Sequence, residues 1–189
     1  LECALTVNFT QEVYIMNKIL IVYFSHRGEN YWNGGMKVLT KGNTEIAAEM
    51  IAKITGGDLF EVETARPYSE HYRECVQEAR EEFMNQTRPA LKTYPDGVED
   101  YDTIFVGYPN WCGTMPMAMF TFLERYDWSG KRVLPFCTNE GSGMGRSVAD
   151  LKKICPGALV EDGLPVHGAE TADSFGMIEA WVQKNLTND

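Results

Sequence analysis

The stretch formed by residues 18–57 limits the folds available to this chain more than any other. Residues 19–24 are all apolar or aromatic, as in a buried β-strand, and Ser25 follows directly. A polar segment at 26–42, which we expect to be irregular, leads to residues 43–54, where apolar residues recur every three or four positions. Two glycines then end this periodic run as a helix C-cap would. A buried strand, a loop and an amphipathic helix form the first half of a β-α-β unit.

The loop at the start of this helix has the residues of an anion-binding site. Ser25, Gly42, Asn43 and Thr44 supply hydroxyl and N–H groups without bulk. The first N–H groups of a helix lack partners within it, and the helix dipole favours a negative charge beside them. Asn and Thr are also common helix caps, and the lysine of a Walker loop is missing. A phosphate site and a plain helix cap therefore both remain open.

Charge and cysteine usage exclude several classes of protein. The 189 residues carry a formal net charge of −10 with a pI near 4.8, so a nucleic-acid backbone would repel this chain. No apolar run approaches the roughly 20 residues that a membrane-spanning helix needs. The five cysteines are scattered and lack a C-x-x-C pair, which indicates free thiols rather than a zinc site. We therefore expect a cytoplasmic protein without a nucleic-acid partner or a membrane span.

The rest of the sequence alternates between strand and helix patterns. Strands are expected at 58–62, 101–108, 131–137 and 158–164, and helices near 69–83, 116–125, 146–155 and 175–186. This alternation predicts an α/β fold whose parallel sheet carries helices on both faces. No shift in composition divides the chain, so we expect one domain at 16–189. Residues 1–15 are interpreted as an extension or a cloning remnant outside the fold.

The helix near 69–83 carries the densest charge of the chain. We expect Ser69 to cap it, and its apolar stripe is expected to consist of Tyr72, Val76, Ala79 and Phe83. Its other face is rich in glutamate. A solvated helix face is the plain interpretation of these charges, and a surface for docking a partner is the alternative.

Three polar loops follow strands of the expected sheet, at 25–44, 109–115 and 138–143. In a doubly wound sheet, ligands bind beyond the carboxyl ends of the strands. All three loops are rich in Gly, Asn, Ser and Thr, and the second adds Trp111. A phosphate cradle beside an aromatic side chain indicates a flat, aromatic phosphate ester as the ligand.

The three loops together resemble those of the flavodoxins. The similarity lies in Ser25 after the first strand, in Gly-Asn-Thr-Glu at 42–45 and in Gly-Tyr-Pro-Asn-Trp at 107–111. It extends over residues 18–186, nearly the whole chain. The resemblance implies a doubly wound, five-stranded parallel sheet of order 2-1-3-4-5. It also implies a non-covalently bound FMN that carries single electrons between redox partner proteins.

The resemblance assigns individual residues to this cofactor. Ser25, Gly42, Asn43 and Thr44 correspond to the phosphate loop, and Trp111 corresponds to the aromatic residue that covers the flavin ring. Further contacts with the flavin, from the second and third loops, are assigned to Pro109, Asn110, Gly113, Thr114, Thr138, Asn139, Glu140 and Gly141.

The sequence departs from the family at residues 26–41, which are inserted into a loop that is compact in flavodoxins. Either Tyr31 or Trp32 of this insertion could cover the outer face of the flavin, and Arg27 could contact its phosphate. Cys112 has no basic neighbour in the sequence, so we interpret it as a bystander near the flavin rather than a reactive thiol.

Three functions remain open at this point. The first is an electron carrier, for which the excess of Asp and Glu favours partner proteins with basic docking surfaces. The second is an NAD(P)H-dependent, FMN-containing reductase of quinones or nitro compounds, because one fold can host either activity. The third is a non-catalytic FMN-binding module.

Overall fold

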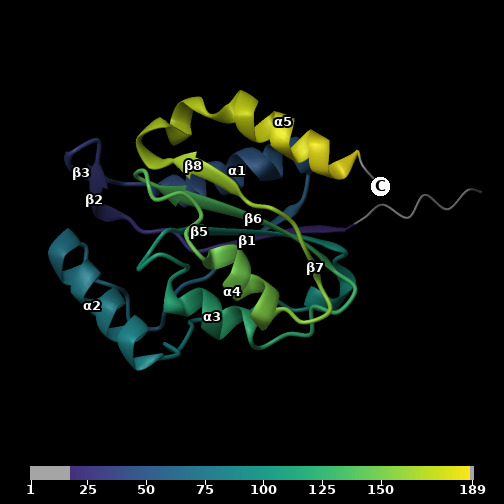
Figure 1. Cartoon of the computed structure of the whole chain (residues 1–189), viewed down its shortest axis with the longest axis horizontal. Helices are drawn as coiled ribbons and strands as arrows, with labels where there is room; N and C mark the ends of the chain where they lie inside the picture. The colour runs from purple at the N-terminus through teal and green to yellow at the C-terminus, as the bar shows by residue number, and fades with distance from the viewer. Residues whose placement is uncertain (1–17, 188–189) are drawn as a thin grey trace, which may run out of the picture.

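The computed structural model describes residues 18–187, and the extension expected at 1–15 lies outside them. A parallel sheet runs through the centre of this region (Figure 1). Its strands are β1 (Ile19–Tyr23), β4 (Asp58–Glu61), β5 (Thr103–Pro109), β6 (Arg132–Asn139), β7 (Leu159–Val160) and β8 (Leu164–His167). β1, β5 and β6 are the apolar runs that the sequence predicts as buried strands, because a strand covered on both faces needs apolar side chains on both.

The strand order confirms the expected topology. The sheet runs β4-β1-β5-β6-β7, every pairing in it is parallel, and β8 also pairs with β6. With β7 and β8 taken as one interrupted strand, this is the order 2-1-3-4-5. The prediction of a single strand at 158–164 is wrong, because the chain leaves the sheet between β7 and β8. There Gly163 passes so close to Met144 that a Cβ atom would overlap it.

Helices cover both faces of the sheet (Figure 1). Helices α1 (Asn43–Thr55) and α5 (Phe175–Leu186) lie on one face and bury a cluster around Ile21, Phe105 and Ile178. Helices α3 (Met117–Leu123) and α4 (Ser147–Ile154) lie on the other face, over a cluster that includes the fully buried Trp128. Burial of these apolar side chains provides most of the stability of the fold.

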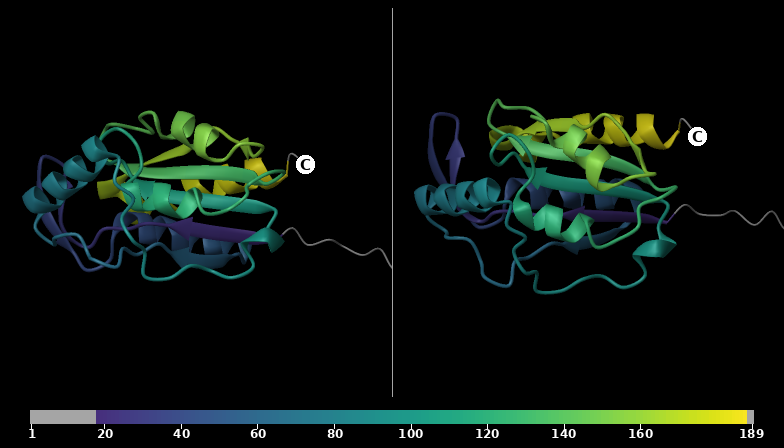
Figure 2. Two further views of the ribbon diagram at one scale, coloured as in Figure 1. Left: turned by 90° about the horizontal axis from the view of Figure 1, so that it is seen from below. Right: turned by 60° about the horizontal axis from the view of Figure 1, so that its bottom comes forward.

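Helix α2 (Tyr72–Asn85) does not follow this plan. It lies beyond the carboxyl ends of the strands in every view (Figures 1 and 2). Its buried side chains, Cys75 and Ala79, belong to neither of the two core clusters found within residues 18–187. Leu91 and Val98, from the extended segment that follows α2, enter the core instead. Because that segment covers this part of the sheet, α2 lies beside the carboxyl ends of the strands instead of on a face.

The expected start and apolar stripe of this helix are therefore partly wrong. The helix begins at Tyr72, and Ser69 lies outside it, where its hydroxyl donates to Glu74. Val76 is 42% exposed although its spacing fits the stripe. A periodic pattern identifies the helix correctly, but it does not tell whether the apolar side faces a core or a pocket.

Residues 26–42 also differ from the irregular loop that we expect. They contain an antiparallel hairpin of β2 (Gly28–Trp32) and β3 (Gly35–Leu39). Its two-residue turn is Asn33-Gly34, with φ values of 46° and 86°. Positive φ at both positions is typical of a type I′ turn, for which Asn-Gly is the preferred sequence. The dipeptide was thus a local signal for the hairpin.

The core predicts opposite effects for two glycine substitutions. A Cβ atom at Gly107, in the middle of β5, would overlap the ring of Phe136, whereas a Cβ atom at Gly176 in α5 would meet no other described residue within 4 Å. We expect Gly107→Ala to lower the free energy of unfolding by about 1–3 kcal/mol. Gly176→Ala should leave it unchanged or raise it by up to about 1 kcal/mol. Urea unfolding curves of both variants test this, and equal stability of the two would contradict the packing described here.

Candidate functional site

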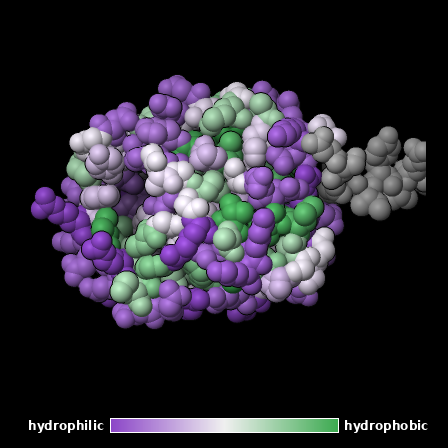
Figure 3. Space-filling model, in the orientation of Figure 1, coloured by the Kyte–Doolittle hydropathy of each residue, from purple (hydrophilic) through white to green (hydrophobic). Residues whose placement is uncertain are grey.

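A pocket of about 410 Å³ lies at the carboxyl ends of the strands. Its lining comes from the start of α1, from the loops after β5 and β6, from the hairpin and from α2. Figure 3 shows the surface hollowed on the side where Figure 1 places α2 and the hairpin. The volume lies in the range of small-molecule sites. Seven residues assigned from the sequence line it: Asn43, Pro109, Asn110, Trp111, Thr138, Asn139 and Glu140.

The start of α1 borders the pocket with free backbone donors. Ser25 Oγ accepts the N–H of Glu45 at 3.1 Å, so a residue at the end of β1 caps the helix in place of a neighbour in the sequence. Gly42 lies so close to Ser25 that a Cβ atom would overlap its hydroxyl. The N–H groups of Asn43 and Thr44 have no acceptor within the helix because they belong to its first turn. They remain for a ligand.

The other phosphate-loop residues lie behind the pocket wall. Thr44 is buried, and its hydroxyl shares a hydrogen bond of 2.8 Å with the hydroxyl of Thr138. This bond joins the start of α1 to the end of β6. Ser25 is also buried and does not line the pocket. These side chains hold the loops together, and the backbone of α1 and the Asn43 side chain face the cavity edge.

Trp111 is fixed by edge-on contacts with three rings. Its centroid lies 5.3 Å from that of Phe24, 5.0 Å from Tyr68 and 5.8 Å from His26. Such T-shaped pairs are favourable because the positive edge of one ring meets the negative face of the other. The indole therefore has a set orientation where it lines the pocket. An indole held in this way can pack against a flat ligand.

A tight turn holds Trp111 in place. The N–H groups of Trp111 and Thr114 each donate to the carbonyl of the other, and the central residues Cys112 and Gly113 have φ values of 53° and 77°. Thr114 is buried and donates its hydroxyl to Asp150, while the Gly113 carbonyl accepts the N–H of Arg146. Gly113 and Thr114 thus lie outside the pocket lining, where they brace the turn.

Cys112 lines the pocket on the side of α2. Burial raises the pKa of its thiol, although Arg80 and Arg146 act in the opposite direction by favouring the thiolate. Burial is the larger of these effects. Although the thiol is exposed, the net shift of its pKa is away from the thiolate form.

The loop after β6 is shaped by its own side chains. Asn139 Oδ1 accepts the N–H groups of Gly141 and Gly143, both at 2.9 Å, and Asn110 donates its amide to the Gly143 carbonyl. The second and third loops are thus joined directly. Gly141 has a φ of 106° and does not line the pocket.

Glu140 connects this loop to two other segments. Its carboxylate accepts the N–H of Ala169 at 2.9 Å and the N–H of Asn33, at the hairpin tip, at 3.2 Å. His167 Nε2 lies 3.7 Å from the same carboxylate. A Cβ atom at Gly168 would come within 2.5 Å of Glu140 and 2.8 Å of the Asn43 amide. Gly168 therefore allows the third loop and the start of α1 to approach each other.

The hairpin crosses the pocket from α2 to Glu140. At its base, Glu29 donates its N–H to Glu70 and accepts the N–H of Tyr72 with its carboxylate. Tyr31 lines the pocket, with its ring centroid 6.5 Å from that of Tyr72. Trp32 does not line it, and Lys37 Nζ lies 3.7 Å from the centroid of its ring. Of the two aromatic residues left open by the sequence, Tyr31 is the one at the pocket.

Arg27, the other open question in the insertion, has acidic partners. Its guanidinium group lies 2.8 Å from both Glu45 and Glu61. The two carboxylates neutralise the positive charge of Arg27, and Arg27 does not line the pocket. A phosphate in the pocket would therefore not contact it.

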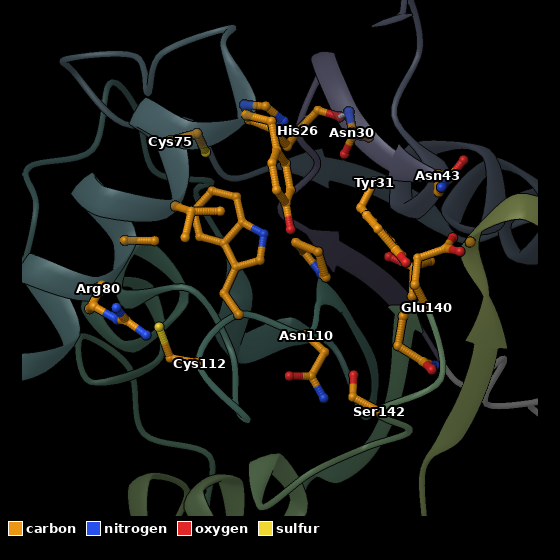
Figure 4. A pocket seen from close by; sticks show the side chains of 18 residues that line it. His26, Asn30, Tyr31, Asn43, Cys75, Arg80, Asn110, Cys112, Glu140 and Ser142 are labelled. Carbon is orange, nitrogen blue, oxygen red and sulfur yellow. Dashed lines mark hydrogen bonds between the residues drawn. The ribbon is translucent and has the colours of Figure 1, made fainter. Parts of the chain in front are cut away.

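Sequence analysis missed the wall that α2 contributes. Five residues of α2 line the pocket opposite the loops after β5 and β6: Tyr72, Cys75, Val76, Ala79 and Arg80. Figure 4 shows Arg80 and Cys112 pointing toward each other, across the cavity from Asn43 and Glu140. Helical periodicity placed Tyr72, Val76 and Ala79 on an apolar stripe, but no local signal shows that the helix leaves the sheet. His26, Asn30, Ser142 and Gly168 also line the pocket and were not assigned.

Two classes of site are not found in the described part of the chain. Residues 18–187 contain no group of three or more His, Cys, Asp or Glu side chains that could hold a metal ion. Among the helices of this region, none is long and apolar enough to cross a membrane.

Comparison with known proteins identifies the family. The model of the flavodoxin family matches residues 36–185, well over half of the chain. A putative flavoprotein from Bacteroides eggerthii is 30% identical, with 90% of this chain and 99% of that chain covered and a TM-score of 0.69. One from Bacteroides uniformis is 27% identical, with 88% and 98% covered and a TM-score of 0.70.

A third structure shares the fold at lower identity. It is a flavoprotein from Lactobacillus acidophilus in complex with FMN, 21% identical over 85% of this chain and 99% of that chain, with a TM-score of 0.59. A search of curated proteins gives no sequence match. The strand order, the position of the pocket and the family model agree, and this chain belongs to the flavodoxin family.

Proposed function

We propose that this protein binds FMN non-covalently in the pocket and carries electrons, one at a time, between redox partner proteins. The observation that supports this most directly is that a helix N-terminus and a fixed aromatic side chain border the same cavity. The free N–H groups at the start of α1 lie at one side, and the fixed indole of Trp111 lies at another. A phosphate ester with a flat aromatic ring needs both. The structure from Lactobacillus acidophilus shows that a protein of this fold can hold FMN.

The residues present fit the phosphate of FMN. The backbone N–H groups of Asn43 and Thr44 and the positive end of the α1 dipole favour a dianion there. Glu140 is the carboxylate near this place, and two backbone N–H groups donate to it. Gly168 lets the third loop approach the start of α1, because a Cβ atom there would overlap Glu140 and Asn43.

The residues also fit the ring. Trp111 offers a rigid apolar surface, and Tyr31 of the hairpin offers a second aromatic side chain at the same pocket. We propose that Tyr31, rather than Trp32, covers the outer face. FMN supplies the redox chemistry when it is bound, and the protein determines its surroundings. Trp111, Tyr31 and the α2 wall would exclude water from the ring and thereby disfavour added negative charge on it.

The proposed role as a carrier rests on charge. The net charge of −10 and the glutamate-rich outer face of α2, which lies beside the pocket, suit partner proteins with basic docking surfaces. The four described cysteines are free thiols, in keeping with a cytoplasmic location.

A second candidate function is favoured by the α2 wall. In an electron carrier, the edge of the flavin ring must be accessible to a partner protein. Here α2 instead adds an apolar surface and Arg80 beside the place proposed for the ring. That arrangement also suits an NAD(P)H-dependent reductase of quinones or nitro compounds.

The first prediction of this proposal concerns FMN binding. Purified protein incubated with FMN should turn yellow and release FMN on heating, as identified by chromatography. Trp111→Ala should weaken binding by at least about 0.5–1.5 kcal/mol through lost ring contacts. Trp32→Ala is the matched control, because Trp32 lies outside the pocket, and it should leave the dissociation constant unchanged. Titration of flavin fluorescence measures both. A protein that stays colourless, or equal effects of the two variants, would refute the assigned site.

The second prediction separates a carrier from a reductase. Electron transfer to a basic reductase should slow as salt is added, because screening shortens the reach of the acidic surface to about 10 Å at 0.1 M. Oxidation of NADPH by the pure protein with a quinone acceptor should be negligible. Rapid NADPH turnover without a partner protein would favour the reductase. If neither assay shows electron transfer while FMN stays bound, the non-catalytic FMN-binding module is the better description.

A further inference from the structure

The pocket has an end that the flavodoxin loops do not form. This end is lined by Cys75, Val76, Ala79 and Arg80 of α2, together with Trp111 and Cys112. The side chains of Cys75 and Ala79 are buried, yet they pack into neither core cluster of residues 18–187. Their burial therefore belongs to this end of the pocket and to the segments beside it. An apolar wall of this kind suits the flat side of an organic molecule.

Arg80 places a positive charge at this apolar wall. It forms no ion pair with any residue in the part of the chain that the structure describes, although α2 is rich in glutamate. Helix geometry gives the reason. Residues three and four positions away are the neighbours on a helix surface, and for Arg80 these are Val76, Gln77, Phe83 and Met84. None of the four is acidic.

The charge at this end is opposite to that of the protein as a whole. Arg80 lines the pocket and its guanidinium group points toward Cys112, whereas Arg146 does not line the pocket. Arg146 is paired with Asp150 at 3.1 Å and lies over the ring of Phe83. Arg80 has no such compensation. In a chain of net charge −10, this makes a local site for an anion beside an apolar surface.

We propose that the α2 end of the pocket is a subsite for a planar organic anion, such as an aromatic carboxylate or sulfonate, whose negative group pairs with Arg80. The flat part of this molecule lies against Val76 and Ala79, next to the place proposed for the flavin ring. The inference rests on the proposed FMN site and extends it to a small-molecule electron acceptor of the quinone class.

The reaction balances with FMN as the donor. The quinone gains two electrons and two protons and leaves as the hydroquinone. Reduced FMN gives up two electrons and one proton, and water supplies the second proton. The role of Arg80 is to bind and orient the acceptor, and it exchanges no proton.

The test uses the FMN-loaded protein, reduced by light in the absence of oxygen, and two probes. One is 1,4-naphthoquinone-2-sulfonate, and the other is the uncharged 2-methyl-1,4-naphthoquinone. Stopped-flow absorbance follows the return of the oxidised flavin over a range of probe concentrations. Arg80→Gln removes the charge at nearly the same size, and Arg73→Gln, on the same helix but outside the pocket, is the matched control.

We expect Arg80→Gln to raise the half-saturating concentration of the sulfonate about tenfold, the loss typical of one charge-assisted hydrogen bond. The same variant should leave the uncharged quinone unaffected, and Arg73→Gln should change neither. Equal effects of Arg80→Gln on both probes, or no effect on either, would overturn the subsite. Weaker binding of FMN itself by Arg80→Gln would also overturn it, because Arg80 would then belong to the cofactor site. A failure of the unmodified protein to bind FMN would instead refute the proposed function.

Discussion

Parallel pairing of β1, β5 and β6 is the constraint on which the rest of the structure depends. Parallel neighbours end at the same edge of the sheet, so the three polar loops that follow these strands meet there. Hydrogen bonds then join the loops in pairs. Ser25 caps α1, Thr44 binds Thr138, and Asn110 binds the carbonyl of Gly143. Each bond links segments far apart in the sequence and holds the loops together at the sheet edge.

The displacement of α2 beyond the strand ends gives this pocket a side that the three loops do not form. In a doubly wound sheet a helix after the edge strand is expected to cover a face. Here the extended segment with Leu91 and Val98 covers that part of the sheet, and α2 stands beyond the strand ends. The hairpin is tied to α2 through Glu29 and to the third loop through Glu140. Together they enclose a cavity that the flavodoxin loops alone would leave open.

These two features divide the pocket by charge. The start of α1 offers backbone donors to a phosphate, and the α2 end offers Arg80 beside apolar side chains. Between them lie the rings of Trp111 and Tyr31. Anion-binding groups at two places in one cavity suit two anionic molecules held near each other. Electron transfer between the two would then need no large movement of the chain.

The sequence by itself determined the central strands and most of the helices, because buried strands and amphipathic helices leave periodic patterns that local physics imposes. The order of the sheet was implied by the resemblance of the loops to those of the flavodoxins. The sequence also identified the loop residues at the strand ends, seven of which line the pocket. It missed the turn signal of Asn33-Gly34, and it could not place α2, whose apolar stripe suits a core and a cavity equally well. The position of Arg80 at the pocket was decided by tertiary structure alone, since the surroundings of a charge depend on which elements meet in space. Local periodicity indicates that a side chain is buried, and only the tertiary structure shows which residues bury it.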